Sequence, residues 1–153
     1  MKKLLIAGFV LVVLFACNKD KYQTKPQISL KSVSTKVVPT NGNLTVVLSY
    51  TDKEGDISDS LYIKKVRLNK TVVTTLRDSL KYKIPDFPDY SKGEIDLALQ
   101  YQNNLISAVN PPPIPGSNPS VPQPDTLLLK FWIRDKAGNV SDTVTTGQIV
   151  IIR

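Results

Sequence analysis

A strict alternation of apolar and polar side chains limits how this chain can fold more than any other feature. Every second residue from Leu44 to Tyr50 is large and apolar, and the pattern returns between Asp125 and Arg134. Because successive side chains of a β-strand point to opposite faces, a period of two is typical of a strand with one buried face. Helical periodicity is absent after Cys17, so the sequence predicts an all-β domain.

Shorter segments extend this pattern. Alternating segments begin at Gln27 and Gly93, and Leu61–Leu68 is a further strand in which the apolar phase changes between Ile63 and Val66. That change predicts a β-bulge. Two more strands are expected at Thr71–Leu76, which is β-branched, and at Val140–Ile152. About seven short strands separated by turn residues are typical of an antiparallel β-sandwich.

Proline interrupts the pattern once on a large scale. Asn110–Pro124 contains seven of the eleven prolines, and no inner strand or helix can run through such a segment. We expect an exposed, polyproline-like loop between two strands. The alternative is a dedicated peptide-binding surface.

The N-terminus has the layout of a secretory signal. Lys2 and Lys3 precede the uncharged run Leu4–Ala16, which is shorter than the roughly 20 residues of a membrane-spanning helix. The run ends in Leu14-Phe15-Ala16-Cys17, which resembles the lipobox of bacterial lipoproteins. The resemblance implies cleavage before Cys17, a thioether to diacylglycerol and an N-terminal acyl chain such as palmitate. The alternative is an ordinary signal peptide with a chance cysteine near the cut.

The chain is therefore divided into a signal peptide at 1–16, a lipid-anchored tether at 17–26 and one β domain at 27–153. Asn18–Lys21 loosely resembles the export signals of Bacteroidetes-type surface lipoproteins. We expect a location in the cell envelope, on the outer membrane, with the periplasmic and surface sides both open. Cys17 is the only cysteine, so no intramolecular disulfide stabilises the domain.

Three motifs carry a second resemblance. Asp52–Ile57, Gly93–Leu97 and the run Phe131–Ser141, which contains Asp-Lys-Ala-Gly-Asn, are similar to segments of small Bacteroidetes-type lipoproteins with an immunoglobulin-like domain. This resemblance implies an immunoglobulin-like antiparallel β-sandwich over 27–153. It says little about function, because one fold supports many functions.

The residue inventory argues against an enzyme. Histidine is absent and Cys17 is assigned to lipid, which excludes Ser-His and Cys-His nucleophiles and ordinary zinc sites. No glycine-rich phosphate loop is present, and no lysine stands in an obviously apolar setting that could activate a serine. A pair of carboxylates for glycoside hydrolysis has no positive support.

Asp52, Glu54 and Asp56 form the clearest candidate site. Three carboxylates at alternate positions around Gly55 can converge in a turn, and Ca²⁺ prefers such hard oxygen ligands. The spacing is not that of an EF-hand. An immunoglobulin-like arrangement would bring Asp135 and Asn139 to the same end. The alternative is a solvated acidic turn without a metal.

Trp132 is the second candidate. Alternation places it opposite Phe131 and between Lys130 and Arg134, where its indole could stack on a sugar or be covered by its neighbours. The formal charge of +7 falls to +5 without Lys2 and Lys3, and the remaining basic residues are dispersed, so nucleic acid is not an expected partner.

Together these features predict a lipid-anchored, non-enzymatic binding, adhesion or accessory module of the cell envelope. Its expected partners are the membrane, through the anchor, and an envelope protein or polysaccharide. The alternatives are a structural envelope component without a ligand and a calcium-stabilised module.

Overall fold

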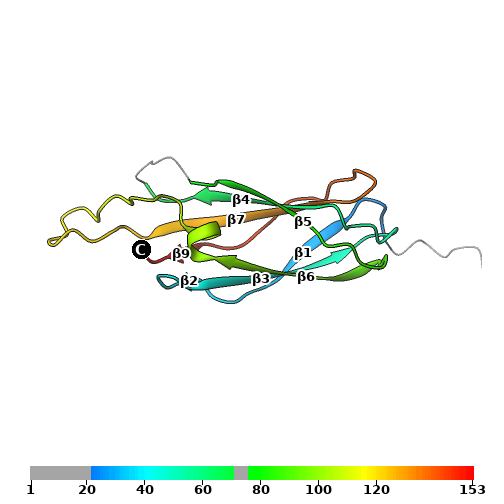
Figure 1. Cartoon of the computed structure of the whole chain (residues 1–153), viewed down its shortest axis with the longest axis horizontal. Coiled ribbons are helices and arrows are strands. Elements are labelled where there is room, and N and C mark those ends of the chain that lie inside the picture. The colour runs from blue at the N-terminus through cyan, green and yellow to red at the C-terminus, as the bar shows by residue number, and fades with distance from the viewer. Residues whose placement is uncertain (1–21, 71–75) are drawn as a thin grey trace, which may run out of the picture.

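The computed structural model describes residues 22–70 and 76–153, which form an all-β domain with a single helical turn, η1 (Tyr101–Leu105) (Figure 1). The expected signal peptide, Cys17 and most of the expected strand at Thr71–Leu76 lie outside the described residues. Within the described ranges, no helix is long and apolar enough to span a membrane. The strands are β1 (Gln27–Val33), β2 (Val37–Val38), β3 (Asn43–Thr51), β4 (Ser60–Arg67), β5 (Ser79–Lys83), β6 (Lys92–Gln100), β7 (Asp125–Arg134), β8 (Val144–Thr145) and β9 (Ile149–Ile151).

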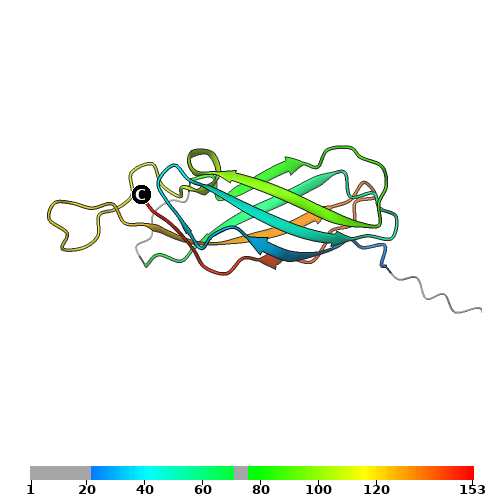
Figure 2. The same cartoon turned by 90° about the horizontal axis from the view of Figure 1, so that it is seen from below.

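The strands form two sheets that pack face to face (Figures 1 and 2). One sheet has the order β1-β3-β6, and the other has the order β2-β9-β7-β4-β5 with β8 paired to β7. All of these pairings are antiparallel except that between β2 and β9. The predicted all-β sandwich is therefore confirmed.

The centre of the core comes from the inward faces of β3 and β7. Both alternating patterns are confirmed, because one side chain in two is buried along each strand. The ladder of β7 is occupied on both edges, by β4 on one side and by β8 and β9 on the other. The fully buried core residues of these two strands are Leu44, Val46, Leu48, Leu127, Leu129, Phe131 and Ile133.

The C-terminal segment differs from the single strand expected at Val140–Ile152. It is divided into β8 and β9, because two of its side-chain hydroxyl groups accept hydrogen bonds from N–H groups of β7 in place of its backbone carbonyls. The Ser141 hydroxyl accepts a hydrogen bond from the Ile133 N–H at 3.0 Å, and the Thr146 hydroxyl accepts one from the Leu129 N–H at 3.0 Å. A further strand that the pattern did not predict, β5, pairs with β4.

The bulge expected in the strand at Leu61–Leu68 is also absent. β4 pairs with β7 in one continuous register from Ser60 to Arg67, so the inward positions continue past Ile63 to Lys65. Lys65 is only 3% exposed, and its ammonium donates hydrogen bonds to the carbonyl oxygens of Leu76 and Ile106 at 2.7 and 2.8 Å. The expectation that no lysine occupies an apolar setting is therefore wrong. Two carbonyls that hold the ammonium make this inward position tolerable.

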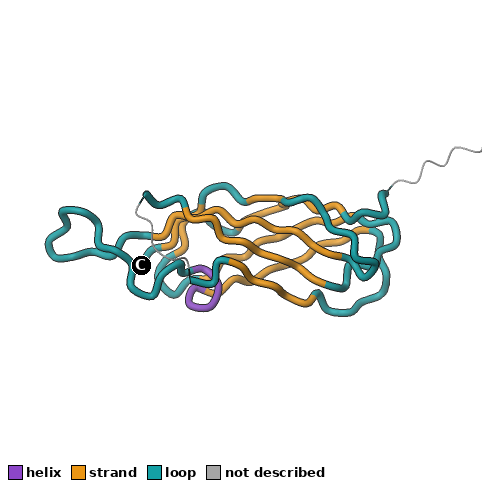
Figure 3. The backbone as a smooth tube through the Cα atoms, turned by 90° about the horizontal axis from the view of Figure 1, so that it is seen from above, coloured by secondary structure: helices purple, strands orange, loops and turns teal. Residues whose placement is uncertain are grey.

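The two ends of the sandwich carry different loops. The tether joins at one end, where Gln27 pairs with Thr51 beside the loop between β3 and β4, and the turn after β7 lies at the same end. The proline-rich segment Asn110–Pro124 lies at the opposite end and extends beyond the sheets as an arm (Figures 1 and 3). Its only strand-like feature is an isolated bridge between Pro113 and Pro122, so the predicted loop is confirmed.

Burial lowers the pKa of Lys65 to about 8. The free energy of unfolding of the domain should therefore change with pH in the alkaline range. Below pH 8 the lysine is charged in the folded and unfolded states, so its burial penalty is present in full. Between pH 8 and the unfolded pKa of about 10.5, only the unfolded chain remains protonated, and the folded state gains on the order of 3 kcal/mol. We predict this rise for the wild type relative to Lys65→Met, measured by urea unfolding from pH 7 to 10.5. Parallel pH profiles of the two proteins would contradict it.

Candidate metal centre

The loop after β3 wraps around one carboxylate. Asp52 follows the end of the strand and is fully buried. Its Oδ2 atom accepts hydrogen bonds from the backbone N–H groups of Gly55, at 2.8 Å, and Asp56, at 3.1 Å. An aspartate that binds backbone groups three and four residues ahead closes a compact turn. The turn brings the side chain of Asp56 back toward Asp52.

Gly55 is the residue that permits this turn. Its φ angle is +75°, a conformation that side chains other than glycine rarely adopt. A Cβ atom here would also lie 2.7 to 2.9 Å from backbone atoms of Asp89 and Tyr90. The loop therefore packs closely against the connector that precedes β6, and it has little room to rearrange.

Asp135 reaches the same place from the end of β7. Its two carboxylate oxygens accept hydrogen bonds from the Asn139 backbone N–H at 2.7 Å and the Asn139 side-chain amide at 2.9 Å. The Lys136 N–H donates to the carbonyl oxygen of Asp56 at 3.0 Å, which joins the two loops directly. Asn139 therefore orients Asp135 through its donor groups.

Three carboxylates converge between these loops. One oxygen each from Asp52, Asp56 and Asp135 lies within 4.8 Å of the others. The Oδ1 atoms of Asp52 and Asp56 are buried and have no hydrogen-bond partner among the described residues. Glu54 belongs to the same loop but is exposed and lies outside this group. Of the four residues predicted from the sequence, the structure thus brings three together.

Burial raises the pKa of Asp52 to about 6, and the neighbouring Asp56 carboxylate adds to the rise. The backbone N–H groups of Asp56 and Gly55 act in the opposite direction by stabilising the charged form. Below pH 6 the proton held by Asp52 can offset its repulsion with Asp56. At neutral pH the buried Oδ1 atoms of Asp52 and Asp56 need another positive partner.

A hard divalent cation fits that need. Ca²⁺ binds carboxylate oxygens and completes its shell of six to eight ligands with backbone carbonyls and water. Buried carboxylate oxygens without donors are unusual, because buried polar atoms are almost always paired. Asp52, Asp56 and Asp135 are the residues that would hold the ion.

The other predicted site residue, Trp132, is half-buried on the outer face of β7. Its indole stacks on the ring of Tyr62 in β4, with ring centroids 5.4 Å apart and an angle of 1° between the planes. The Lys81 ammonium lies 5.5 Å from the centroid of the Tyr62 ring. One face of the indole is thus covered by a protein ring, which is the alternative considered from the sequence.

The sequence reasoning missed a group of buried charges at the opposite end of the sandwich. The signal for them was present, because the alternation that buries Leu61 and Ile63 also places Lys65 and Arg67 on the inner face of β4. In the same way, Asp125 continues the inward face of β7.

Comparison with known proteins adds no functional assignment to these residues. No protein-family model matches the chain, and no curated protein sequence matches it significantly. The chemistry of the candidate metal centre is therefore argued from its own side chains.

The raised pKa of Asp52 predicts a pH dependence in the calcium-free protein. The folded state holds a proton that the unfolded state releases near pH 3.8, so stability falls as pH rises from about 4 to 6. The loss is on the order of 3 kcal/mol relative to Asp52→Asn, whose amide oxygen can still accept both backbone hydrogen bonds. Urea unfolding in excess chelator measures this difference. A gap between wild type and variant that stays constant from pH 4 to 7 would count against the cluster.

Proposed function

We propose that this chain is a lipid-anchored, non-enzymatic binding module of the cell envelope in which Ca²⁺ stiffens the end nearest the anchor. The observation that carries the calcium role is the pair of buried, unpartnered oxygens on Asp52 and Asp56, with Asp135 beside them. A solvated turn, the alternative, would leave these atoms in contact with water.

The tether supports a role for the ion near the membrane. The Lys53 N–H, in the acidic loop, donates a hydrogen bond to the carbonyl oxygen of Gln23 at 3.0 Å, and Lys25 forms an ion pair with Asp142 at 2.6 Å. The described part of the tether, residues 22–26, therefore joins the sandwich beside the three carboxylates. An ion that holds the two loops together would give the anchor a rigid point of attachment.

The lipid anchor itself is proposed from Cys17 and the apolar run before it. Each buried methylene contributes about 0.8 kcal/mol, and two or more acyl chains hold a protein stably on a bilayer. The strand order supports the resemblance to immunoglobulin-like lipoproteins, because the first, second and fifth long strands share one sheet as in that sandwich.

A binding role is favoured over a purely structural one by a hollow at the far end of the sandwich. A structural spacer needs only polar faces, whereas the end that carries the proline-rich arm has a pocket of about 550 Å³. That volume lies within the range of small-molecule sites. The absence of histidine and the assignment of Cys17 to lipid support a non-enzymatic role.

The lysine with a lowered pKa does not point to a serine hydrolase. Ser107 lies next to Ile106, whose carbonyl binds the Lys65 ammonium, but Ser107 has no exposed area. A substrate could not reach its hydroxyl.

Calcium should raise the unfolding temperature of the protein. At 100 times the dissociation constant, a ligand adds about 2.7 kcal/mol to the free energy of unfolding, which corresponds to a rise of about 5 °C or more for a domain of this size. We predict that the rise, measured by calorimetry with excess Ca²⁺ and then with chelator, is lost in Asp52→Asn and Asp56→Asn.

The matched control is Glu54→Gln, which removes one carboxylate from the same loop but outside the converging group. This variant should keep the full calcium shift. If Glu54→Gln loses the shift as well, or if the wild type shows none, the three-carboxylate site is wrong.

The anchor predicts a specific mass. Protein recovered from the membrane fraction should begin at Cys17 and carry a diacylglycerol and an additional acyl chain, as intact-mass spectrometry can show. Cys17→Ser should move the protein to the soluble fraction. A membrane-bound Cys17→Ser protein of unmodified mass would contradict the anchor.

A further inference from the structure

A second group of charged residues lies inside the sandwich, at the end that carries the proline-rich arm. Its members occupy inward positions at the ends of β4 and β7 and just after β9, next to the last buried apolar residue of each strand. They are buried for the same reason as the core, although each is charged. The members are Lys65 and Arg67 of β4, Asp125 of β7 and Arg153 after β9.

Asp125 is the shared counterion of this group. It is fully buried, and its Oδ2 atom accepts a hydrogen bond from the Ser107 N–H at 2.9 Å. The Arg67 Nη2 atom lies 3.1 Å from Oδ1, and the Arg153 Nη1 atom lies 3.6 Å from Oδ2. One carboxylate thus faces two guanidinium groups, with the Lys65 ammonium held nearby by carbonyl oxygens.

Positive charge is therefore in excess at this end. Among the side chains of the described residues, the buried group contains three cations and one carboxylate, and the exposed Arg77 and Asp78, which act on Lys65 with opposite sign, add no net charge. Segment 71–75 contains no ionisable side chain in the sequence. Charges buried without full compensation are costly, so such an excess is unusual in a group that serves stability alone. An anion at this end would remove it.

The two buried arginines differ in position, because Arg153 lines the pocket of about 550 Å³ at this end and Arg67 does not. The side chains of Arg67 and Arg153 are 7% and 6% exposed. The Nη2 atom of Arg67 and the Nη1 atom of Arg153 face Asp125 without forming a hydrogen bond, and the Nη1 atom of Arg67 is buried with no acceptor among the described residues. Guanidinium groups recognise carboxylates through such paired donors.

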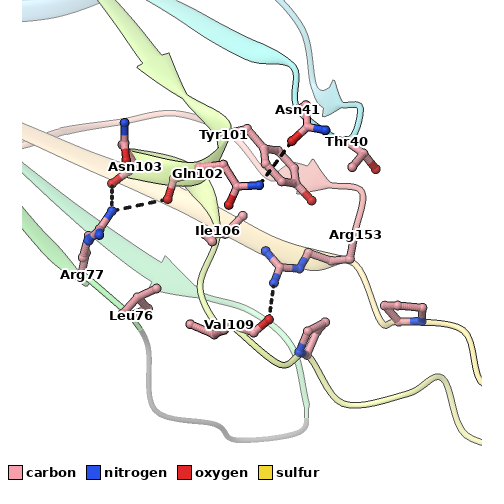
Figure 4. A pocket seen from close by; sticks show the side chains of 12 residues that line it. Thr40, Asn41, Leu76, Arg77, Tyr101, Gln102, Asn103, Ile106, Val109 and Arg153 are labelled. Atoms are coloured by element: carbon pink, nitrogen blue, oxygen red, sulfur yellow. Dashed lines mark hydrogen bonds between the residues drawn. The ribbon is translucent and has the colours of Figure 1, made fainter.

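Arg153 connects this group to the pocket of about 550 Å³ (Figure 4). Its Nη2 atom donates to the carbonyl oxygens of Ala108 and Val109 at the start of the arm, and its guanidinium lies 6.0 Å from the centroid of the Tyr101 ring. The Tyr101 hydroxyl donates to the Ile152 carbonyl at 2.7 Å, which fixes the backbone beside Arg153. These contacts hold the guanidinium at the pocket wall.

The rest of the pocket wall is of two kinds. Amide side chains and a second, exposed arginine line one part, and aliphatic side chains and prolines line the other. The Nη1 atom of Arg77 donates to the carbonyl oxygen of Asn103 at 3.0 Å, which places it over the helical turn η1 (Figure 4). The polar part contains Asn41, Arg77, Gln102 and Asn103, and the apolar part contains Leu76, Ile106, Val109 and two prolines.

We propose that this pocket binds an acidic saccharide, with the carboxylate of a uronic acid unit directed to Arg153 and Arg77. The amides suit the hydroxyl groups of such a unit, and the aliphatic and proline surface suits its C–H faces. This proposal names the ligand class for the binding role proposed above and rests on that role. The pocket lies at the end opposite the tether (Figure 1), so its ligand would come from the side away from the anchor.

The test compares galacturonic acid with galactose, which differ in one carboxylate, by isothermal titration of the full chain in detergent. Galacturonic acid should bind about tenfold more tightly or better, since a hydrogen bond to a charged group contributes at least about one factor of ten. The Arg153→Gln and Arg77→Gln variants should each weaken galacturonic acid binding several-fold or more. Arg77 is exposed, so its variant tests the site even if Arg153→Gln fails to fold.

Arg134→Gln is the matched control, because it removes an arginine at the opposite end, where Arg134 pairs with Asp59. It should leave binding unchanged. Equal affinity for galacturonic acid and galactose, or for galacturonic acid and inorganic phosphate, would overturn the proposal. Galacturonic acid binding that neither Arg153→Gln nor Arg77→Gln weakens would overturn it as well. Calcium titration of the same sample separates the two proposals, because Asp52→Asn should lose calcium binding and keep galacturonic acid binding.

Discussion

The pairing of β7 on both edges is the constraint on which the rest of this structure depends. A strand that is hydrogen bonded to β4 on one side and to β8 and β9 on the other cannot shift its register without moving its whole inner face out of the core. That register buries Phe131 and places Trp132 against Tyr62 outside. It also determines the position of the two aspartates that bound the strand, Asp125 at its start and Asp135 just after its end.

These two aspartates lie in opposite electrostatic settings. Asp135 meets Asp52 and Asp56, so the end near the tether has an excess of buried negative charge. Asp125 meets Arg67 and Arg153, so the end with the proline-rich arm has an excess of positive charge. Neither group is balanced by the described residues around it. The same physical imbalance, with opposite sign, supports a cation at one end and an anionic ligand at the other.

On the outer surface of the second sheet, the tryptophan considered as a ligand platform also makes a structural contact. Trp132 and Tyr62 are direct neighbours across the β4–β7 pair, and neighbouring aromatic side chains on one face of a sheet stack readily. Lys81 lies on the next strand in the same row and adds its ammonium to the Tyr62 ring. The row stabilises the sheet by covering one face of the Trp132 indole.

The sequence alone predicted the long alternating strands β3 and β7, the proline-rich interruption and the candidate turn at Asp52–Asp56, because alternation, proline and clustered carboxylates are local features. It did not predict β5 or the division of the C-terminal segment into β8 and β9. Tertiary structure decided which charges meet. Asp135 joins the acidic turn and Glu54 does not, since only the packing of the loops selects which side chains point inward. Lys65 and Arg153 were missed because a charged residue in a pattern is expected to face water. Lys65 faces inward because the register of a paired strand applies to every residue along it, and neighbouring carbonyls make that burial tolerable. Arg153 follows the end of β9 and is held inward by its ion pair with Asp125.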